Sequence, residues 1–560
     1  MVVSPRSREL GDRLEQLKLA SGRSYEGIGR KVHLSKSAVH RYCTGASVPQ
    51  EFAVVERIAR ACGASREELV RLHRAWLRAT AGADGDAVDA VDVVDAVDVV
   101  QERLPPVVDR RPAPPSRPFA RFKVALTLAV IAVVMAVLPA GGSRAVHSAG
   151  GTGGRGDQWV AGPSWQLPPT PVRGTLFGVT INSATGEMPA FRVGAARFWD
   201  GGTRWSEIQR RRGEFEWAAL ERLVAGAEKA GLPALFVFGG TPKWANPAGA
   251  AGPYPDGTSA PPVDLADWDL FVRTLVERYR GRLEAYELWV LANDRRFFSG
   301  SAETLVEMTR RANGIIRSLD PKATVVCPGM GELWNPEGVS FLKRFIELGG
   351  YDHCDVASIK LFQRKSTDPP ETMLEITDSV DRVMHDAGVH RTLWSTGTAY
   401  SIPTQERLDR VVARNYAVRF FLTGIYARKV NLERMYFYNW GGTKIPIVLQ
   451  PVGGSPTDAA LAVEQLQHWL RNAHVRSCGH GATAGLPENV WQCDFTVVEP
   501  DRTYEATIRW TDRGTATTTA GPRIRELRRL DGTVEAVDPG AGIAVTEEPV
   551  LLATPPASPR

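Results

Sequence analysis

Three carboxyl groups lie in or near strand-like segments in the middle of the chain, where side chains that transfer protons could be placed. Glu287 and Asp294 belong to the run YELWVLAND, residues 286–294, and Glu332 follows a later strand. Glu287 stands four residues before Leu291, about 13 Å along an extended strand, so we expect it in the protein interior. Asp294 and Glu332 are more simply surface loop residues. Leu291, at the strand end itself, has no group that can donate a proton.

A second set of candidate residues lies near the N-terminus, in LSKSAVHRYCTG, residues 34–45. Lys36, Ser37, His40 and Arg41 are polar and avoid the face of the expected helix that carries Val39. Such side chains can contact base edges or phosphates. Residues 1–80 carry 15 Lys and Arg against eight Asp and Glu, so the basic charge is concentrated here. This pattern indicates DNA binding; the alternative is a protein-binding helical module whose charges serve solubility.

The first 80 residues predict five short helices that would position these side chains. Leu10, Leu14 and Leu17 recur at helical spacing, and Ser65 with Glu68 forms a capping box for the last helix. Over its whole length this segment resembles the XRE (Cro/C1-type) helix-turn-helix family, and LSKSAVHRYCTG matches that family's recognition helix and following turn. The resemblance implies that the N-terminal side chains of this helix enter the major groove of DNA.

Residues 81–120 predict a linker and residues 121–143 a transmembrane helix. An Asp recurs every third residue from 86 to 98, which we interpret as a solvated tether, with competition against DNA as the alternative; residues 104–118 are rich in Pro. Residues 124–143 carry no charge, and 20 helical residues span about 30 Å, one bilayer core. The basic residues that concentrate just before the span are Arg110, Arg111, Arg117, Arg121 and Lys123. Their position predicts a cytoplasmic N-terminus and an extracytoplasmic C-terminal part.

From residue 174 onward, strand-like runs alternate with amphipathic helical runs. Eight such strands occur over about 270 residues, from LFGVTI at 176–181 to RMYFYNW at 434–440. This alternation predicts a (β/α)₈ barrel, a TIM barrel, at residues 174–445. We expect a Gly/Pro-rich stalk before it, at 144–173, and a β-rich accessory domain after it, at 446–560.

The segment RFWDGGTRWSEIQRRRGEFEWAALERLVAGAEKAGLPALFVFGGTPKWA, residues 197–245, resembles glycoside hydrolases of family thirty-nine and their relatives in clan A. The resemblance extends from about residue 174 to the end of the chain. It rests on several spaced residues in the family's order: Arg197, Asp200, Trp205, Trp217, Trp244, Trp289 and Asn293.

The catalytic positions that this resemblance implies are not occupied by catalytic residues. Retaining members use two carboxyl groups about 5 Å apart, one as acid/base and one as nucleophile. Leu291 stands at the acid position, Gly397 stands at the nucleophile position, and Lys360 replaces a histidine. Neither leucine nor glycine can perform these steps. The sequence therefore predicts a barrel without catalytic residues, an inactive relative of the hydrolases.

A carbohydrate cleft is predicted to remain at the barrel. Trp244, Trp289 and Trp440 offer flat apolar faces that suit pyranose rings, although each could equally be a core residue. Asn293 is a further candidate, and Lys360 would favour an acidic glycan or fill the space left by histidine.

The six cysteines show no metal-ligand spacing, and we expect neither a metal site nor a cofactor. Cys478 and Cys493 flank a plausible hairpin outside the membrane and are predicted to form a disulfide. Cys327 is expected late in one barrel strand and Cys354 at the start of the next. These positions would lie at opposite ends of parallel strands, so we predict no bond between them.

Together these features predict a single-pass cell-membrane protein in which residues 1–80 bind DNA and an external barrel binds a cell-surface glycan without cleaving it. One alternative is an active glycoside hydrolase with displaced carboxylates. The other is a membrane scaffold whose helix-turn-helix binds protein.

Overall fold

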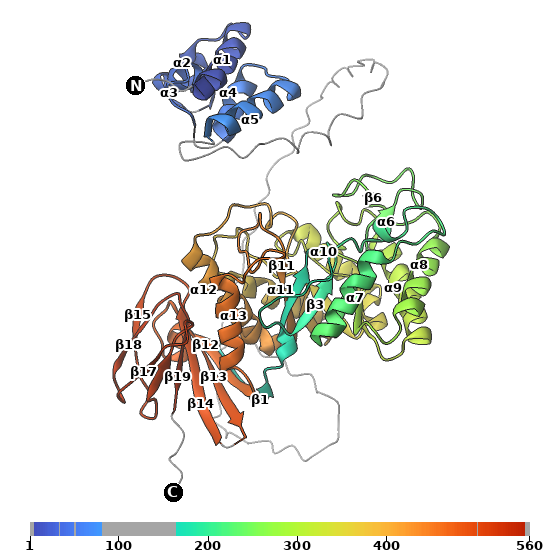
Figure 1. Ribbon diagram of the computed structural model, residues 1–560, viewed down its shortest axis with the longest axis vertical. Coiled ribbons are helices and arrows are strands. Elements are labelled where there is room, and N and C mark those ends of the chain that lie inside the picture. The colour runs from blue at the N-terminus through green and yellow to red at the C-terminus, as the bar shows by residue number, and fades with distance from the viewer. Residues whose placement is uncertain (1–4, 33, 50–51, 81–163, 501, 555–560) are drawn as a thin grey trace, which may run out of the picture. The chain divides into compact units, whose positions relative to one another are not determined.

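The computed structural model describes residues 5–32, 34–49, 52–80, 164–500 and 502–554, which belong to two compact units (Figure 1). The first unit contains the described residues up to 80, and the second contains those from 164 onward. No helix in these ranges is both long and apolar enough to cross a bilayer. The predicted span at 121–143 lies outside the described residues.

The N-terminal unit is a bundle of five helices around a small apolar core. Leu10, Leu14, Ile28 and Val39 are buried in it. Gly29 is needed for the sharp connection between the second and third helices, because a Cβ there would lie 2.5 Å from the carbonyl oxygen of Leu34. The helices are α1 (Pro5–Ala20), α2 (Tyr25–Val32), α3 (Lys36–Cys43), α4 (Phe52–Ala61) and α5 (Arg66–Thr80).

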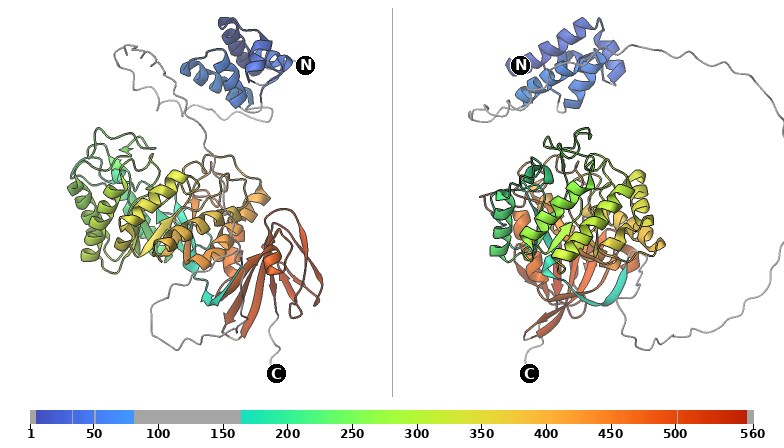
Figure 2. Two further views of the ribbon diagram at one scale, coloured as in Figure 1. Left: turned by 180° about the vertical axis from the view of Figure 1, so that it is seen from behind. Right: turned by 90° about the vertical axis from the view of Figure 1, so that its right-hand side faces the viewer.

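The second unit is built on a closed barrel of eight parallel strands. The strands lie inside a surrounding layer of helices (Figures 1 and 2). Their order around the barrel follows the chain, as expected for successive right-handed β–α connections. The strands are β2 (Phe177–Ile181), β3 (Ala195–Phe198), β4 (Ala234–Val237), β7 (Ala285–Glu287), β8 (Thr324–Val326), β9 (Val356–Ile359), β10 (Thr392–Ser395) and β11 (Leu432–Trp440).

The barrel helices bury one apolar face against the strands, with Leu220, Phe271 and Ile316 among the fully buried residues. They are α6 (Trp205–Ile208), α7 (Ala218–Ala230), α8 (Leu265–Tyr279), α9 (Ala302–Leu319), α10 (Pro336–Glu347), α11 (Leu374–Asp386) and α12 (Arg410–Tyr426). Short 3₁₀ turns are η1 (Gly174–Leu176), η2 (Gly350–His353), η3 (Pro370–Met373) and η4 (Ala427–Val430), and a two-stranded ribbon joins β5 (Thr241–Pro242) to β6 (Gly257–Thr258).

A seven-stranded sheet packs beside the barrel and is reached through helix α13 (Asp458–Trp469). Its order is β1 (Trp165–Pro171), β12 (Ala473–His480), β13 (Val490–Glu499), β14 (Arg502–Thr511), β19 (Val550–Ala553), β16 (Glu526–Arg528) and β17 (Val534–Ala536). The turn η5 (Gly481–Ala484) joins β12 to β13, and a separate ribbon pairs β15 (Ala516–Thr519) with β18 (Gly542–Val545).

Strand β1 corrects the expected extent of the stalk. Residues 165–171 were assigned to the stalk because of their prolines, yet they form an edge strand antiparallel to β12. An edge strand tolerates proline because one side of it needs no ladder hydrogen bonds. The register with β12 shifts between Gln166 and Thr170, where Pro168 and Pro169 lie.

The structure contains two disulfides. One joins Cys478 to Cys493, which face each other on β12 and β13. The other joins Cys327 to Cys354, so the prediction that these two cysteines are not bonded is wrong. Strand β8 has only three residues, and the cysteines flank the single Val326–Val356 pair instead of lying at opposite ends of long strands. Their Cα atoms are 5.4 Å apart, within the range of a disulfide.

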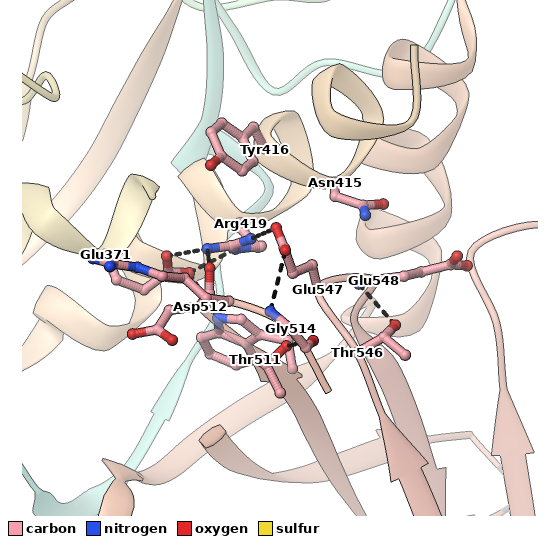
Figure 3. Close-up of polar contacts among 12 residues, drawn as sticks. Glu371, Asn415, Tyr416, Arg419, Thr511, Asp512, Gly514, Thr546, Glu547 and Glu548 are labelled. Carbon is pink, nitrogen blue, oxygen red and sulfur yellow. Dashed lines mark hydrogen bonds and ion pairs between the residues drawn. The ribbon is translucent and has the colours of Figure 1, made fainter. Parts of the chain in front are cut away.

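A buried arginine connects the barrel to the sheet (Figure 3). Arg419 of α12 is fully buried and donates two hydrogen bonds to Glu371 of η3, at 2.9 and 2.5 Å. It also contacts Glu547 at 3.2 Å and the carbonyl oxygen of Asp512 at 3.0 Å. Trp510 of β14 donates its indole N–H to Glu371 at 2.7 Å. One guanidinium therefore satisfies acceptors from both substructures at their junction.

We expect Arg419→Met to lower the free energy of unfolding of residues 164–560 by about 3–5 kcal/mol, because it leaves the Glu371 carboxylate buried without its cation. The matched control is Arg310→Met, which breaks an exposed pair with Glu307 and should cost less than about 1 kcal/mol. Urea unfolding measures both. Equal stability of the two variants would contradict the role assigned to Arg419.

Candidate functional site

The centre of the barrel holds a buried cluster of charges around Glu287, the last residue of β7. Its side chain is fully buried and accepts hydrogen bonds from Arg197 Nε at 3.0 Å, Ser358 Oγ at 3.0 Å, Lys360 Nζ at 2.5 Å and Thr396 Oγ1 at 2.8 Å. The Lys360 ammonium also donates to the carbonyl oxygen of Thr396 at 3.0 Å. Side chains from β3 and from β9, β10 and their ends thus meet at one carboxylate on β7.

The two ionisable partners in this cluster respond differently to burial. Burial by itself would raise the pKa of Glu287, but the charges of Arg197 and Lys360 outweigh it and hold that pKa below its ordinary value. Burial lowers the pKa of Lys360 to about 7, and the attraction of Glu287 offsets only part of this effect. The Glu287 side chain is therefore ionised and paired with Arg197 and Lys360, so it has no proton to donate.

The two predicted catalytic positions lie at the carboxyl end of the barrel strands and carry no reactive group. Leu291 has φ of 41° and is 5% exposed, in an apolar cluster with Trp199, Val237 and Phe297. Gly397 has φ of 118°, a conformation that L side chains rarely adopt. Apolar packing occupies one position, and the backbone conformation disfavours a side chain at the other.

A pocket of about 320 Å³ opens above these positions, and we call it the mouth pocket. Its lining includes Leu291, Lys360 and Thr396, together with aromatic and charged side chains from the surrounding loops. Among the described residues that line the mouth pocket, Asp200 carries the single carboxyl group. The lining also includes the side chains of Arg204, Tyr254 and Tyr400. A mechanism with two carboxyl groups therefore lacks one of its components in this pocket.

Asp200 lies in the mouth pocket, a position that the sequence analysis did not predict. Tyr254 donates its hydroxyl to Asp200 Oδ1 at 3.2 Å, and the Arg204 guanidinium lies 4.0 Å from the centre of the Tyr254 ring. Burial raises the pKa of Asp200, partly offset by Tyr438 and Arg197. The available signal was its position two residues after strand β3, because residues that follow barrel strands line the mouth.

The predicted sugar-stacking tryptophans do not line the mouth pocket. Trp289 is 0% exposed and packs against Trp268 and Phe298. Trp440 is 1% exposed and donates its indole N–H to Gln450. Both are core residues, which corrects their assignment to a cleft. Trp244 is partly buried, donates to the carbonyl oxygen of Gln209 and faces the Arg212 guanidinium.

Asn293 and the two loop carboxylates hold the strand-end loops in place. Asn293 accepts from the backbone N–H of Gly331 at 2.5 Å and donates to the carbonyl oxygen of Gly338 at 3.1 Å. Asp294 and Glu332 share the Arg296 guanidinium, at 2.5 and 3.2 Å. None of these residues belongs to the described lining of the mouth pocket, whereas Lys360 does.

Helix α3 presents the four predicted DNA-contacting side chains together on its exposed face. Lys36, Ser37, His40 and Arg41 are all exposed, whereas Val39 on the opposite face is fully buried. The helix begins after Ser35, whose hydroxyl accepts from the backbone N–H of Ala38 at 3.1 Å. The His40 ring packs in a T-shaped arrangement against the Tyr25 ring.

Cations on this unit divide into two groups. Arg13, Lys18, Arg60 and Arg78 form ion pairs with neighbouring glutamates. By contrast, Lys36 and Arg41 on α3, with Arg30 and Lys31 at the end of α2, form no hydrogen bond or ion pair through their side chains with any described residue. Four unpaired cations therefore lie where α2 meets α3, while Arg8, Arg23 and Arg57, elsewhere on this unit, are also without a side-chain hydrogen-bond or ion-pair partner among the described residues.

A family model described as "Helix-turn-helix domain" matches residues 9–72. The N-terminal unit is a helix-turn-helix domain. In this helix-turn-helix domain, α3 covers most of the segment for which the sequence predicts the recognition helix, and α2 precedes it.

The second unit has the fold of glycoside hydrolase barrels. A family 39 glycoside hydrolase from the gut symbiont Bacteroides cellulosilyticus WH2 superposes with a TM-score of 0.51 at 16% identity, covering 69% of this chain and 81% of that one. A glucosidase from Croceicoccus marinus (TM-score 0.49, 15% identity, 70% and 98% covered) and a GH39 beta-xylosidase from Caulobacter crescentus (0.46, 12%, 70% and 98%) are also similar. No curated protein matches the sequence. At 16% identity, the likeness to the Bacteroides cellulosilyticus hydrolase shows the fold alone.

The lowered pKa of Lys360 predicts a pH-dependent stability. Because its pKa is about 7 in the folded protein and 10.5 ordinarily, the unfolded chain binds more protons between these values. The free energy of unfolding should therefore rise with pH from about 7 to 9, by at most about 1.4 kcal/mol per pH unit. Urea unfolding across this range should show the slope in the natural protein and a flatter one in Lys360→Met. An unchanged slope in the variant would contradict the inference that the buried Lys360 ammonium loses its proton near pH 7 in the folded protein.

Proposed function

We propose that the protein is a membrane-anchored DNA-binding regulator whose extracytoplasmic barrel binds carbohydrate without hydrolysing it. The observation that carries the DNA-binding part is the unpaired cationic face of α3 in a helix-turn-helix domain. Phosphates attract such cations, and α3 offers both charged and uncharged donors for base edges.

The non-hydrolysing barrel is supported by the chemistry of its mouth. Leu291 and Gly397 provide no acid and no nucleophile, and Glu287 is neutralised by Arg197 and Lys360. The mouth pocket keeps features that suit a sugar: a volume of about 320 Å³, the aromatic rings of Tyr254 and Tyr400, and polar groups at Asp200 and Arg204. Loss of catalytic groups removes stabilisation of the transition state but need not remove ground-state binding.

For DNA binding, we expect Lys36→Gln and Arg41→Gln to weaken binding of the 1–80 fragment to its operator by about 1–3 kcal/mol each where they contact bases. Arg60→Gln is the matched control, because it removes the same charge from a side chain paired with Glu56 on α4. Gel-shift titrations against the upstream region of the protein's own operon measure this. Failure to bind any genomic fragment at low salt, with capture of a cytoplasmic protein instead, would favour the scaffold alternative.

For the barrel, we expect residues 164–560 to show no turnover of aryl glycosides. Leu291→Glu combined with Gly397→Glu should not restore activity, because a side chain at φ of 118° is strained. Affinity electrophoresis in cell-surface polysaccharides should detect binding that Tyr400→Ala weakens and Trp244→Ala, outside the mouth pocket, does not. Wild-type hydrolysis that Asp200→Asn abolishes would instead support the displaced-carboxylate alternative.

For topology, the proposed anchor is the apolar segment 121–143, with basic residues on its N-terminal side. Reporter enzymes fused after residue 115 should be active inside the cell and those fused after residue 160 outside it. The opposite pattern of activity would rule out a regulator that links an external barrel to DNA.

A further inference from the structure

A second pocket, of about 590 Å³, lies at the opposite end of the barrel from the mouth. Its lining includes Phe177, the first residue of β2, whereas Leu291 and Gly397 follow the carboxyl ends of their strands. In a parallel barrel these positions are on opposite faces. We call this cavity the basal pocket; β1, α13 and the start of β12 form its walls.

Three arginines line the basal pocket: Arg173 before η1, Arg192 before β3, and Arg471 after α13. All three are exposed, and their side chains make no hydrogen bond or ion pair with any described residue. The described lining contains no Asp or Glu. Three like charges therefore line one pocket whose described wall has no carboxylate, while Arg192 and Arg471 also border an adjacent pocket that includes Asp458, Glu464 and Asp531.

The main chain at each arginine is nevertheless fixed. The backbone N–H of Arg192 donates to Glu464 at 3.1 Å, and its carbonyl oxygen accepts from Gln467 at 2.6 Å. The carbonyl oxygen of Arg173 accepts from Leu176 at 3.0 Å, and the N–H of Arg471 donates to the carbonyl oxygen of His468. The side chains thus extend from a held backbone, which lowers the entropy lost when they bind a ligand.

Local structure accounts for one of the three charges. Arg471 follows the C-terminus of α13, where the helix dipole favours a cation. Arg173 and Arg192 do not follow a helix of this kind, and Glu464, the acceptor for the Arg192 backbone, lies outside the described lining of the basal pocket. Their convergence with Arg471 therefore points to a ligand.

We propose that the basal pocket binds a phosphoryl group. A guanidinium presents a planar fork of donors that matches phosphate oxygens, and it stays charged at physiological pH. A single carboxylate carries one negative charge and would leave two of the three arginines unmatched, whereas a phosphate monoester or diphosphate carries two or more. The phosphoryl group belongs either to a lipid headgroup or to a soluble phosphorylated molecule. This site is independent of carbohydrate binding at the mouth.

The test uses the full chain in micelles of a nonionic detergent at low salt, titrated with pyrophosphate by calorimetry. The variant is Arg173→Gln, Arg192→Gln and Arg471→Gln combined. The control is Arg280→Gln, which removes one exposed charge at the C-cap of α8, before β7 and outside the basal pocket. Anion binding by the helix-turn-helix domain persists in every variant and provides the baseline.

We expect each single Arg→Gln change in the basal pocket to weaken the pocket's pyrophosphate binding about tenfold or more, as for a lost charge-assisted hydrogen bond. The triple variant should lose this binding, Arg280→Gln should retain it, and a triple Arg→Lys variant should retain part of it. Near-ultraviolet circular dichroism checks that the variants fold. If the triple glutamine variant does not fold, the pyrophosphate affinity of the triple Arg→Lys variant is compared with that of the natural protein instead.

Competition separates the two sources of the phosphoryl group. Phosphatidylglycerol added to the micelles should displace pyrophosphate, and phosphatidylcholine should not, if the ligand is an anionic lipid headgroup. Unchanged affinity with both lipids would identify a soluble phosphate. The proposal is overturned if the triple variant binds pyrophosphate like the natural protein, if Arg280→Gln weakens binding equally, or if citrate binds more tightly than pyrophosphate.

Discussion

Burial of the Glu287 carboxylate is the constraint around which the barrel interior is organised. A carboxylate removed from water needs compensating charge and hydrogen bonds, and here three strands and their ends, β3, β9 and β10, supply them through Arg197, Ser358, Lys360 and Thr396. These polar side chains satisfy one another beneath the mouth. The hydrogen bonds and ion pairs of this cluster therefore hold the strand ends together. They also keep the Glu287 carboxyl group ionised, so that it cannot donate a proton.

The mouth above this cluster combines a binding-site shape with apolar packing at the key positions. Leu291 completes a cluster with Trp199 and Phe297, and Gly397 occupies a backbone conformation suited to glycine. At the junction with the sheet, the buried Arg419 is likewise paired with carboxylates, those of Glu371 and Glu547 (Figure 3). Charges that stabilise the second unit are thus matched internally.

Unmatched charge, by contrast, marks surfaces that are open to partners. On the helix-turn-helix domain, Arg13, Arg60 and Arg78 pair with glutamates, whereas Lys36 and Arg41 on α3 have no side-chain partner among the described residues. At the base of the barrel, Arg173, Arg192 and Arg471 converge without a carboxylate in the described lining. An anion is the natural complement of both surfaces, DNA phosphates for the first and a phosphoryl group for the second.

The sequence by itself determined the elements and the missing chemistry, because both depend on local pattern and residue type. The periodicity of apolar residues located five helices and eight barrel strands, and Leu291 and Gly397 cannot catalyse in any fold. Tertiary structure alone decided which side chains are accessible and which distant residues meet. Trp289 and Trp440 are buried by neighbours far along the chain, the shortness of β8 brings Cys327 to Cys354, and pairing with β12 turns a proline-rich stretch into β1. Burial and contact depend on the packing of whole elements, which residue spacing within one segment does not encode.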